Sequence, residues 1–290
     1  MTPPRCGVIG LGNMGCGIAA NLDAARLLHA VWDTNASAHA RFPGAQSGIA
    51  AAAGCEIVLL AVPGSAQIAA LFEAGLLDGP DGRVMIDLTT SDPGATKLLA
   101  DRAAVAGVEY LDAGMSGGAA GAATGRLTLM IGGAPTALAR VRPVLDLIAT
   151  QIFHLGPSGA GHTMKLIHNM ICHTIFLATS EGCRAAERAG IPLNRAVEAL
   201  NAGNARSFVS ERRFPDHIVS GGFDGRSEAG NLAKDLAMAR TLFDDLEQPS
   251  AYVGLTADLL AQAGQEGLLG QDFTRLYPAY DALVQCWRNG

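Results

Sequence analysis

The segment Cys6–Gly15 has the sequence CGVIGLGNMG and decides the fold that we predict for this chain. Its first half is short and apolar, as in a buried β-strand. Its glycines have the spacing GxGxxG, and an alanine-rich run over residues 13–28 favours a helix. The first glycine of such a loop permits a tight turn, the second lets a phosphate approach the backbone, and the third allows close helix–strand packing. The segment therefore predicts a strand, a phosphate-binding loop and a helix in succession.

An acidic residue follows at the distance that a dinucleotide site needs. Asp33 ends a second predicted strand (residues 29–33), 23 residues after the first glycine. A carboxylate there accepts hydrogen bonds from the ribose hydroxyls of NAD and repels the 2′-phosphate of NADP. Thr34 and Asn35 follow, with no neighbouring arginine to hold a phosphate. We predict NAD, with NADP as the alternative; a structural glycine turn with Asp33 as a turn residue is the other interpretation. The predicted cofactor-binding loop is Gly10, Leu11, Gly12, Asn13, Met14 and Gly15.

Further apolar runs complete an α/β pattern. Strands are predicted at 55–63, 83–88, 108–112 and 127–131, and helical segments separate most of them. Strands that alternate with helices indicate βαβ units and a doubly wound, mostly parallel sheet of Rossmann type. After residue 156 the pattern is helical, and a long helix is predicted over 162–189. We expect a Rossmann domain over 1–161 and an all-α domain over 162–290, joined by this helix.

The composition excludes several classes of protein. Of 290 residues, 49% are apolar and 17% are charged, which argues against disorder. The net charge of −6 without a basic run argues against binding to nucleic acid or an anionic membrane. The stretch 164–178 is apolar, but it is shorter than the ~20 residues of a membrane span and contains lysine, asparagine and histidine. Without CxxC pairs or an export-type leader, the six cysteines are expected to be reduced thiols in a soluble, cytoplasmic protein.

Two further segments carry candidate chemistry. Ser116, Gly117 and Gly118 follow a predicted strand, and backbone N–H groups with a hydroxyl form a cradle for an anion. A glycine-rich turn without a ligand is the alternative. Lys165 and Asn169 are four residues apart, so they share a face of the long helix. A lysine among apolar residues either extends its charge to solvent or exchanges a proton with an alcohol or carbonyl oxygen.

Taken together, these motifs resemble those of the β-hydroxyacid dehydrogenases, a family of 3-hydroxyisobutyrate dehydrogenase-like enzymes. The family's GxGxMG loop matches residues 10–15, and its DxxxSGG segment matches residues 112–118. Its GxxGxGxxxKxxxN segment matches residues 156–169, and its KDL motif matches residues 234–236. The resemblance covers nearly the whole chain and implies a Rossmann domain followed by a helical domain.

The resemblance also implies roles for individual residues. Lys165 would be the general acid/base, Asn169 would orient the substrate, and Lys234 would reach cofactor and substrate. Residues 116–118 would hold the substrate carboxylate. The nicotinamide half would be lined by Val62, Pro63 and Thr90. The implied reaction is hydride transfer between NAD and the β-hydroxyl carbon of a small anionic hydroxy acid, or the corresponding semialdehyde. Homodimers or homotetramers through the helical domain are also implied.

Three departures from the family pattern leave the substrate open. Gly114-Met115 stands where the family often has Pro-Val, and Gln67 stands where it often has Asn. The segment 226–232 is more polar than usual. An imine or semialdehyde reductase on the same scaffold and a non-catalytic nucleotide-binding protein remain alternatives, although the presence of Lys165 argues against both.

Other polar residues are given structural interpretations. His162, His168 and His173 are separated by six and five residues, so they do not form an i, i+4 ligand pair. We expect no metal site and interpret these histidines as packed or interfacial. Arg206, Arg212 and Arg213 could bind a second anionic group, but a solvated helix face is the preferred interpretation.

Overall fold

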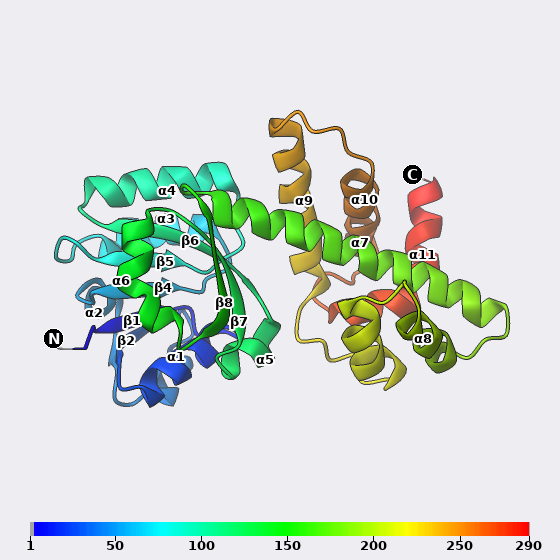
Figure 1. Ribbon diagram of the computed structural model, residues 1–290, viewed down its shortest axis with the longest axis horizontal. Helices are drawn as coiled ribbons and strands as arrows, with labels where there is room; N and C mark the ends of the chain where they lie inside the picture. The colour runs from blue at the N-terminus through cyan, green and yellow to red at the C-terminus, as the bar shows by residue number, and fades with distance from the viewer. Residues whose placement is uncertain (1–2, 290) are drawn as a thin grey trace. The chain divides into compact units, whose positions relative to one another are not determined.

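The computed structural model describes residues 3–289, which form two compact units. The first unit ends at Lys165 and the second begins at Leu166. The first contains an eight-stranded sheet with the strand order β3-β2-β1-β4-β5-β6-β7-β8 (Figure 1). Its strands, in chain order, are β1 (Cys6–Ile9), β2 (Leu28–Trp32), β3 (Gln46–Ser47), β4 (Ile57–Leu60), β5 (Val84–Asp87), β6 (Glu109–Ser116), β7 (Leu127–Gly132) and β8 (Ala149–Gly156).

The direction of the strands confirms the predicted Rossmann-type sheet. Strands β1 to β6 are all parallel, in the order 3-2-1-4-5-6. This is the order of a dinucleotide-binding Rossmann sheet, whose ligand binds at the carboxyl ends of the strands. Strand β7 is antiparallel to β6, and β8 is parallel to β7. The sheet is therefore mixed at one end, where the two strands from 127 to 156 extend it.

Both faces of the sheet are buried, which explains the apolar runs of the sequence. In β4, Ile57 and Leu59 pack on one face, whereas Val58 and Leu60 pack on the other. The first face is covered by α1 (Gly15–Ala24), α5 (Gly118–Ala123) and α6 (Pro135–Leu145). The second is covered by α2 (Ile49–Ala53), α3 (Ser65–Leu71), the π-helical η2 (Phe72–Leu76) and α4 (Pro93–Val105). A short 3₁₀ segment, η1 (Ala36–Arg41), follows β2.

A buried arginine donates hydrogen bonds to the backbone at the amino ends of the strands. Arg83, just before β5, is 1% exposed, and burial lowers its pKa. Its guanidinium donates to four carbonyl oxygens: Ala53 at 2.7 Å, Leu76 at 3.2 Å, Leu77 at 2.8 Å and Pro80 at 2.8 Å. Ala53 and Leu76 are the last residues of α2 and η2, and Leu77 and Pro80 follow η2, so one side chain satisfies carbonyls at the ends of two helical segments.

The second unit is helical, as predicted. Its elements are most of α7 (Ala160–Arg188), α8 (Leu193–Ala202), the π-helical η3 (Val209–Val219), α9 (Ala229–Asp245), α10 (Tyr252–Gln265), η4 (Phe273–Arg275) and α11 (Leu276–Asn289). Its core contains Phe176, Phe214, Phe273 and Tyr277, with ring centroids 5.2–6.2 Å apart. Among residues 3–289, no helix has the length and apolar character needed to cross a membrane.

Three details differ from the sequence-based expectation. Strands β3 and β8 were not expected, and β6 extends four residues beyond the predicted end at 112. The long helix begins at Ala160, two residues before its predicted start, because the buried Asp112 accepts hydrogen bonds from the N–H groups of Gly159 and His162. Gly161 therefore lies within the helix.

Candidate active site

The glycine loop joins β1 to α1 with the geometry of a phosphate cradle. Gly10 has a φ of +90°, and a Cβ there would lie 2.4 Å from Ala61 O. A Cβ on Gly15 would lie 1.8 Å from Gly10 O. At Gly12, by contrast, a Cβ would meet no atom within 4 Å. Two glycines are therefore required by packing, whereas the middle one borders open space.

The start of α1 has donors for an anion. Met14 is its N-cap, and among the described residues no side chain caps the helix. Within residues 3–289, Cys16 N donates to Gly12 O, and no protein acceptor is found for the N–H groups of Gly12 and Asn13. Free N–H groups at a helix N-terminus bind phosphate, and the helix dipole favours the negative charge.

Asp33 lies just beyond β2 and is tied to the loop. Its Oδ2 accepts a hydrogen bond from Leu11 N at 2.6 Å, and its Oδ1 accepts one from Asn35 N at 2.8 Å. The backbone N–H of Asp33 donates to His39 Nε2 at 2.9 Å. Because Gly10 N also bonds to Trp32 O, the loop and the acid are held as one piece. Loop and acid together fit the adenosine and pyrophosphate half of a dinucleotide.

The residues assigned to the nicotinamide half follow β4 and β5. Val62 is half-buried and Pro63 is exposed in the turn before α3, and Thr90 is half-buried in the loop before α4. Strands β1, β4 and β5 are in parallel register, with Ile9 beside Leu60 and Leu60 beside Asp87. Val62, Pro63 and Thr90 therefore follow the same edge of the sheet as the glycine loop.

The predicted anion cradle begins with the last residue of β6. Ser116 ends the strand, and Gly117 and Gly118 follow with φ values of +124° and +62°. Two successive left-handed residues turn the chain sharply into α5, a conformation that favours glycine. The hydroxyl of Ser116 and the glycine backbone are thus placed at one end of a buried strand.

Lys165 lies against the same strand. Its side chain is 9% exposed, and a Cβ on Gly114 would lie only 2.4 Å from Lys165 Cβ. A Cβ on Gly161 would be 2.3 Å from Met130 O and 2.6 Å from Asp112 O. These glycines allow the first turns of α7 to touch β6 and β7. Lys165 consequently packs beside Gly114, two residues before Ser116.

A buried aspartate that the sequence analysis treated only as part of a motif anchors this helix. Asp112 is fully buried, and it accepts from Gly159 N at 2.7 Å and from His162 N at 2.9 Å. A carboxylate at a helix N-terminus satisfies N–H groups that have no partner within the helix. Asp112 therefore sets where α7 starts, and with it the position of Lys165.

In the helical unit, Asn169 is oriented by the aspartate of the KDL motif. Asn169 is 7% exposed, and its Nδ2 donates to Asp235 Oδ2 at 2.6 Å. Its Oδ1 is 3.1 Å from His168 Nδ1. Lys234 is more exposed, with its Nζ 3.5 Å from Asp235 Oδ1. The sequence analysis gave no role to Asp235. Its only signal in the sequence was its place in the KDL motif.

The remaining polar candidates have partners of their own in the helical unit. Arg206 and Arg212 form exposed ion pairs with Glu211 and Asp216, each at 3.5 Å. Arg213 stacks on the rings of Phe208 and Phe273 and donates to Gly225 O at 3.5 Å; burial lowers its pKa.

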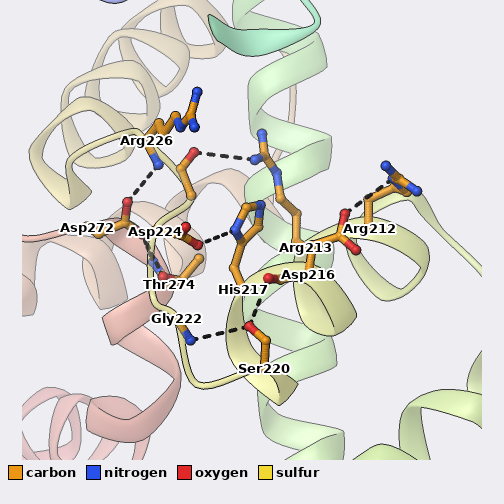
Figure 2. A network of polar contacts seen from close by, with 11 residues as sticks. Arg212, Arg213, Asp216, His217, Ser220, Gly222, Asp224, Arg226, Asp272 and Thr274 are labelled. Carbon is orange, nitrogen blue, oxygen red and sulfur yellow. Dashed lines mark hydrogen bonds and ion pairs between the residues drawn. The ribbon is translucent and has the colours of Figure 1, made fainter. Parts of the chain in front are cut away.

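Figure 2 shows that this arginine segment faces a loop held by short polar contacts. His217 Nδ1 lies 2.7 Å from Asp224 Oδ1, and Asp272 accepts from Arg226 N at 2.7 Å. The hydrogen bond from His217 lowers the pKa of Asp224. These contacts account for the charges of η3 and the following loop. Among residues 3–289, no group of three or more His, Cys, Asp or Glu side chains could hold a metal.

Two family models match the chain. Residues 5–156 match the NAD-binding domain of 6-phosphogluconate dehydrogenase. Residues 159–280 match the NAD-binding domain of NADP-dependent 3-hydroxyisobutyrate dehydrogenase. Together the two models cover nearly all of the chain.

Similar proteins match over almost their full lengths. A 3-hydroxyisobutyrate dehydrogenase of Pseudomonas aeruginosa is 30% identical, covering 94% of this chain and 98% of the relative. An L-threonate dehydrogenase of Escherichia coli is 29% identical, covering 96% and 95%. The solved structure of a 3-hydroxyisobutyrate dehydrogenase from Salmonella typhimurium superposes with a TM-score of 0.86 at 27% identity, covering 94% of this chain and 99% of that one.

Proposed function

Because the chain belongs to the 3-hydroxyisobutyrate dehydrogenase-like family of NAD(P)-dependent β-hydroxyacid dehydrogenases, we propose that it oxidises the β-hydroxyl of a small anionic hydroxy acid, with Lys165 as general acid/base. The observation that carries the proposal is the burial of Lys165 beside Gly114, two residues before Ser116 on the same strand. The bound nicotinamide supplies the hydride acceptor. The protein's own residues bind the carboxylate and move the hydroxyl proton.

Each residue has a defined task in this proposal. Ser116, Gly117 and Gly118 hold the substrate carboxylate, because a hydroxyl and successive N–H groups suit an anion. Lys165 Nζ takes the hydroxyl proton during oxidation and returns it during reduction. Asn169 orients the substrate, and its amide is itself oriented by Asp235. Lys234 contacts both ligands. The semialdehyde is the substrate in the reverse direction.

We also propose NAD as the preferred cofactor. The carboxylate of Asp33 lies at the end of β2 and is tied to the glycine loop through Leu11. A negative charge at this place disfavours the 2′-phosphate of NADP electrostatically. If Asp33→Ser does not shift the ratio of kcat/KM values toward NADP, this assignment is wrong.

The test of the reaction is an absorbance screen at 340 nm with a panel of β-hydroxy acids, first with NAD and then with NADP. Lys165→Ala is expected to lower kcat by about 10²- to 10⁴-fold, the usual contribution of a general acid/base. Arg102→Ala is the control, since Arg102 is an exposed base of α4 in the same unit whose ion-pair partner is Glu73. A Lys165→Ala protein that binds NAD and keeps near full activity would refute the mechanism.

Two further expectations remain proposals. The family resemblance supports a homodimer or homotetramer through the helical unit, which light scattering coupled to gel filtration tests directly. The cytoplasmic location stays a prediction from the cysteine content. Turnover of a cyclic imine without turnover of any hydroxy acid would favour the imine-reductase alternative.

A further inference from the structure

A histidine at the start of α7 is fully buried and only half satisfied. The His162 side chain has no exposed surface, and its Nδ1 lies 2.7 Å from Thr96 Oγ1 of α4. Within residues 3–289, its Nε2 has no hydrogen-bond partner, and the nearest carboxylate oxygen is Asp87 Oδ1 at 3.9 Å. Buried polar atoms are nearly always hydrogen-bonded, so this orphan nitrogen calls for an explanation.

Thr96 and the His162 ring can share their protons in two ways. Thr96 Oγ1 also lies 2.9 Å from Asp92 O. If the hydroxyl proton goes to that carbonyl, Nδ1 donates to Thr96, and a neutral ring would present a lone pair to Asp87. If the hydroxyl donates to Nδ1, the neutral ring already carries its proton on Nε2. Only the second arrangement places an N–H on Nε2, facing Asp87.

The electrostatic surroundings favour the second arrangement. Asp87 and Asp112 are fully buried and lie side by side in the ladder of β5 and β6. Asp87 accepts from Thr89 N at 2.9 Å and from Tyr110 Oη at 2.7 Å. Two adjacent buried carboxylates are costly unless further donors face them.

The titratable groups near His162 come from β5 and β6. They are Asp87, 3.9 Å from Nε2, Asp112, which accepts from the backbone N–H of His162, and Tyr110, which donates to Asp87. Burial, together with the charge of Asp87, raises the pKa of Tyr110 well above its ordinary value, so the phenol stays a neutral donor. An N–H on His162 Nε2 would add a further donor toward Asp87, this one from α7.

We propose that His162 is a positioning residue, whose Nδ1 bonds to Thr96 and whose Nε2–H faces Asp87 across 3.9 Å, and that this link fixes the first turn of α7 and thereby Lys165. Lys165 follows His162 by three residues and shares its side of the helix. Asp112 holds the same turn through the backbone. His162 thus ties the end of β5, which leads to Thr90, to the helix that carries the proposed acid/base. The inference on Lys165 rests on the proposed function; the link itself does not.

The first test needs no substrate. Nitrogen-15 NMR of histidine-labelled protein at neutral pH reports whether each ring nitrogen carries a proton, and the His162→Gln variant assigns the signal. We expect a protonated Nε2 on His162. An unprotonated Nε2 would overturn the proposal, whatever the outcome of the substrate screen.

The second test separates positioning from folding. In His162→Leu, amide hydrogen exchange over residues 160–165 is expected to accelerate, whereas His154→Gln, a control on β8 outside this cluster, should leave it unchanged. With the hydroxy acid that the screen identifies, kcat should fall on the order of 10²-fold, as a displacement of about 1 Å would cause. The dissociation constant for NAD should change less than about twofold, because the glycine loop is untouched. The amide of His162→Gln can donate to Asp87 and should restore most of kcat.

Several results would contradict the link. If amide exchange and kcat are both unchanged in His162→Leu, His162 is only a packed side chain and the proposed link is wrong. If that variant does not fold, Thr96→Val removes only the hydroxyl partner and should show the same acceleration of exchange to a smaller extent. A silent substrate screen with a protonated Nε2 and faster exchange would refute the proposed reaction and leave the structural link standing.

Discussion

The contact between Gly114 and Lys165 gives a sharp prediction. A Cβ on Gly114 would lie 2.4 Å from Lys165 Cβ, 3.0 Å from Lys165 Cγ and 3.2 Å from Gly161 O. Ordinary contact begins near 3.4 Å, so Gly114→Ala must separate α7 from β6 by about 1 Å (3.4 − 2.4). The neighbouring Cβ is fixed to the helix backbone and cannot rotate away. Asp112 and the glycines around it hold that backbone in place.

Two consequences follow from this displacement. Overpacking of this kind typically costs about 1–3 kcal/mol of unfolding free energy. Moving the acid/base by about 1 Å should lower kcat on the order of 10²-fold, which corresponds to roughly 2.7 kcal/mol of activation free energy. The assay is the initial rate at 340 nm at a temperature well below the melting point of the variant, together with thermal unfolding by circular dichroism.

A matched substitution in the same helix provides the control. A Cβ on Gly182 of α7 would meet nothing within 4 Å among the described residues, so Gly182→Ala should keep kcat. It should also stabilise the helix by up to about 1 kcal/mol through propensity. If Gly114→Ala kept kcat within twofold and melted with the wild type, the close packing of Lys165 against β6 would not control catalysis, and the reasoning would fail.

Three further predictions concern the rest of the molecule. Arg83→Met leaves four carbonyl oxygens without their donor and should lower the unfolding free energy by about 2–4 kcal/mol, measured by urea denaturation, whereas an unchanged midpoint would show that water replaces the guanidinium. Gly17→Ala places a Cβ 2.7 Å from Ala123 N, so it should force α1 and α5 apart and lower the melting temperature by several degrees; an unaltered melting curve would contradict this contact. Burial raises the pKa of the Cys6 thiol to about 12 and the pKa of the Cys55 and Cys183 thiols to about 11. In native protein at pH 8 these three thiols should therefore resist a disulfide reagent that labels them after denaturation. Because the unfolded thiols ionise near pH 9 while the folded ones stay protonated, stability should decline as the pH rises above about 9, and a flat profile there would refute the shifts.

Much of the fold was predictable because its signals are local. The glycine loop, the acid after β2 and the apolar runs of β4 and β5 each follow from a few neighbouring residues, and the parallel order then follows from the alternation of strands and helices. Strand β8 escaped prediction because most of its residues are exposed, with Phe153 and Leu155 among them, so it lacks the burial pattern that marks a strand. Strand β3 has only two residues.

The parts of the site that could not be predicted depend on contacts between distant residues. Asp112 accepts hydrogen bonds from residues at the start of α7 that lie 47 and 50 positions later in the sequence. Asn169 and Asp235, which are hydrogen-bonded, are 66 positions apart. Periodicity and spacing carry no information about such pairs. His162 illustrates the limit well: the sequence analysis interpreted it as packed or interfacial, and the structure buries it completely beside Asp87 and Thr96, which lie on two other elements.

The three glycines of the nucleotide loop should tolerate substitution to different degrees under two kinds of selection. Substitutions of Gly10 and Gly15 collide with the backbone, so every variant that a library contains at these positions would be lost in a selection for folded protein alone. Gly12 faces open space and has no left-handed φ, so its variants should survive that selection and disappear only when the cofactor is required. Comparing the two selections position by position would therefore separate what this loop needs in order to fold from what it needs in order to bind.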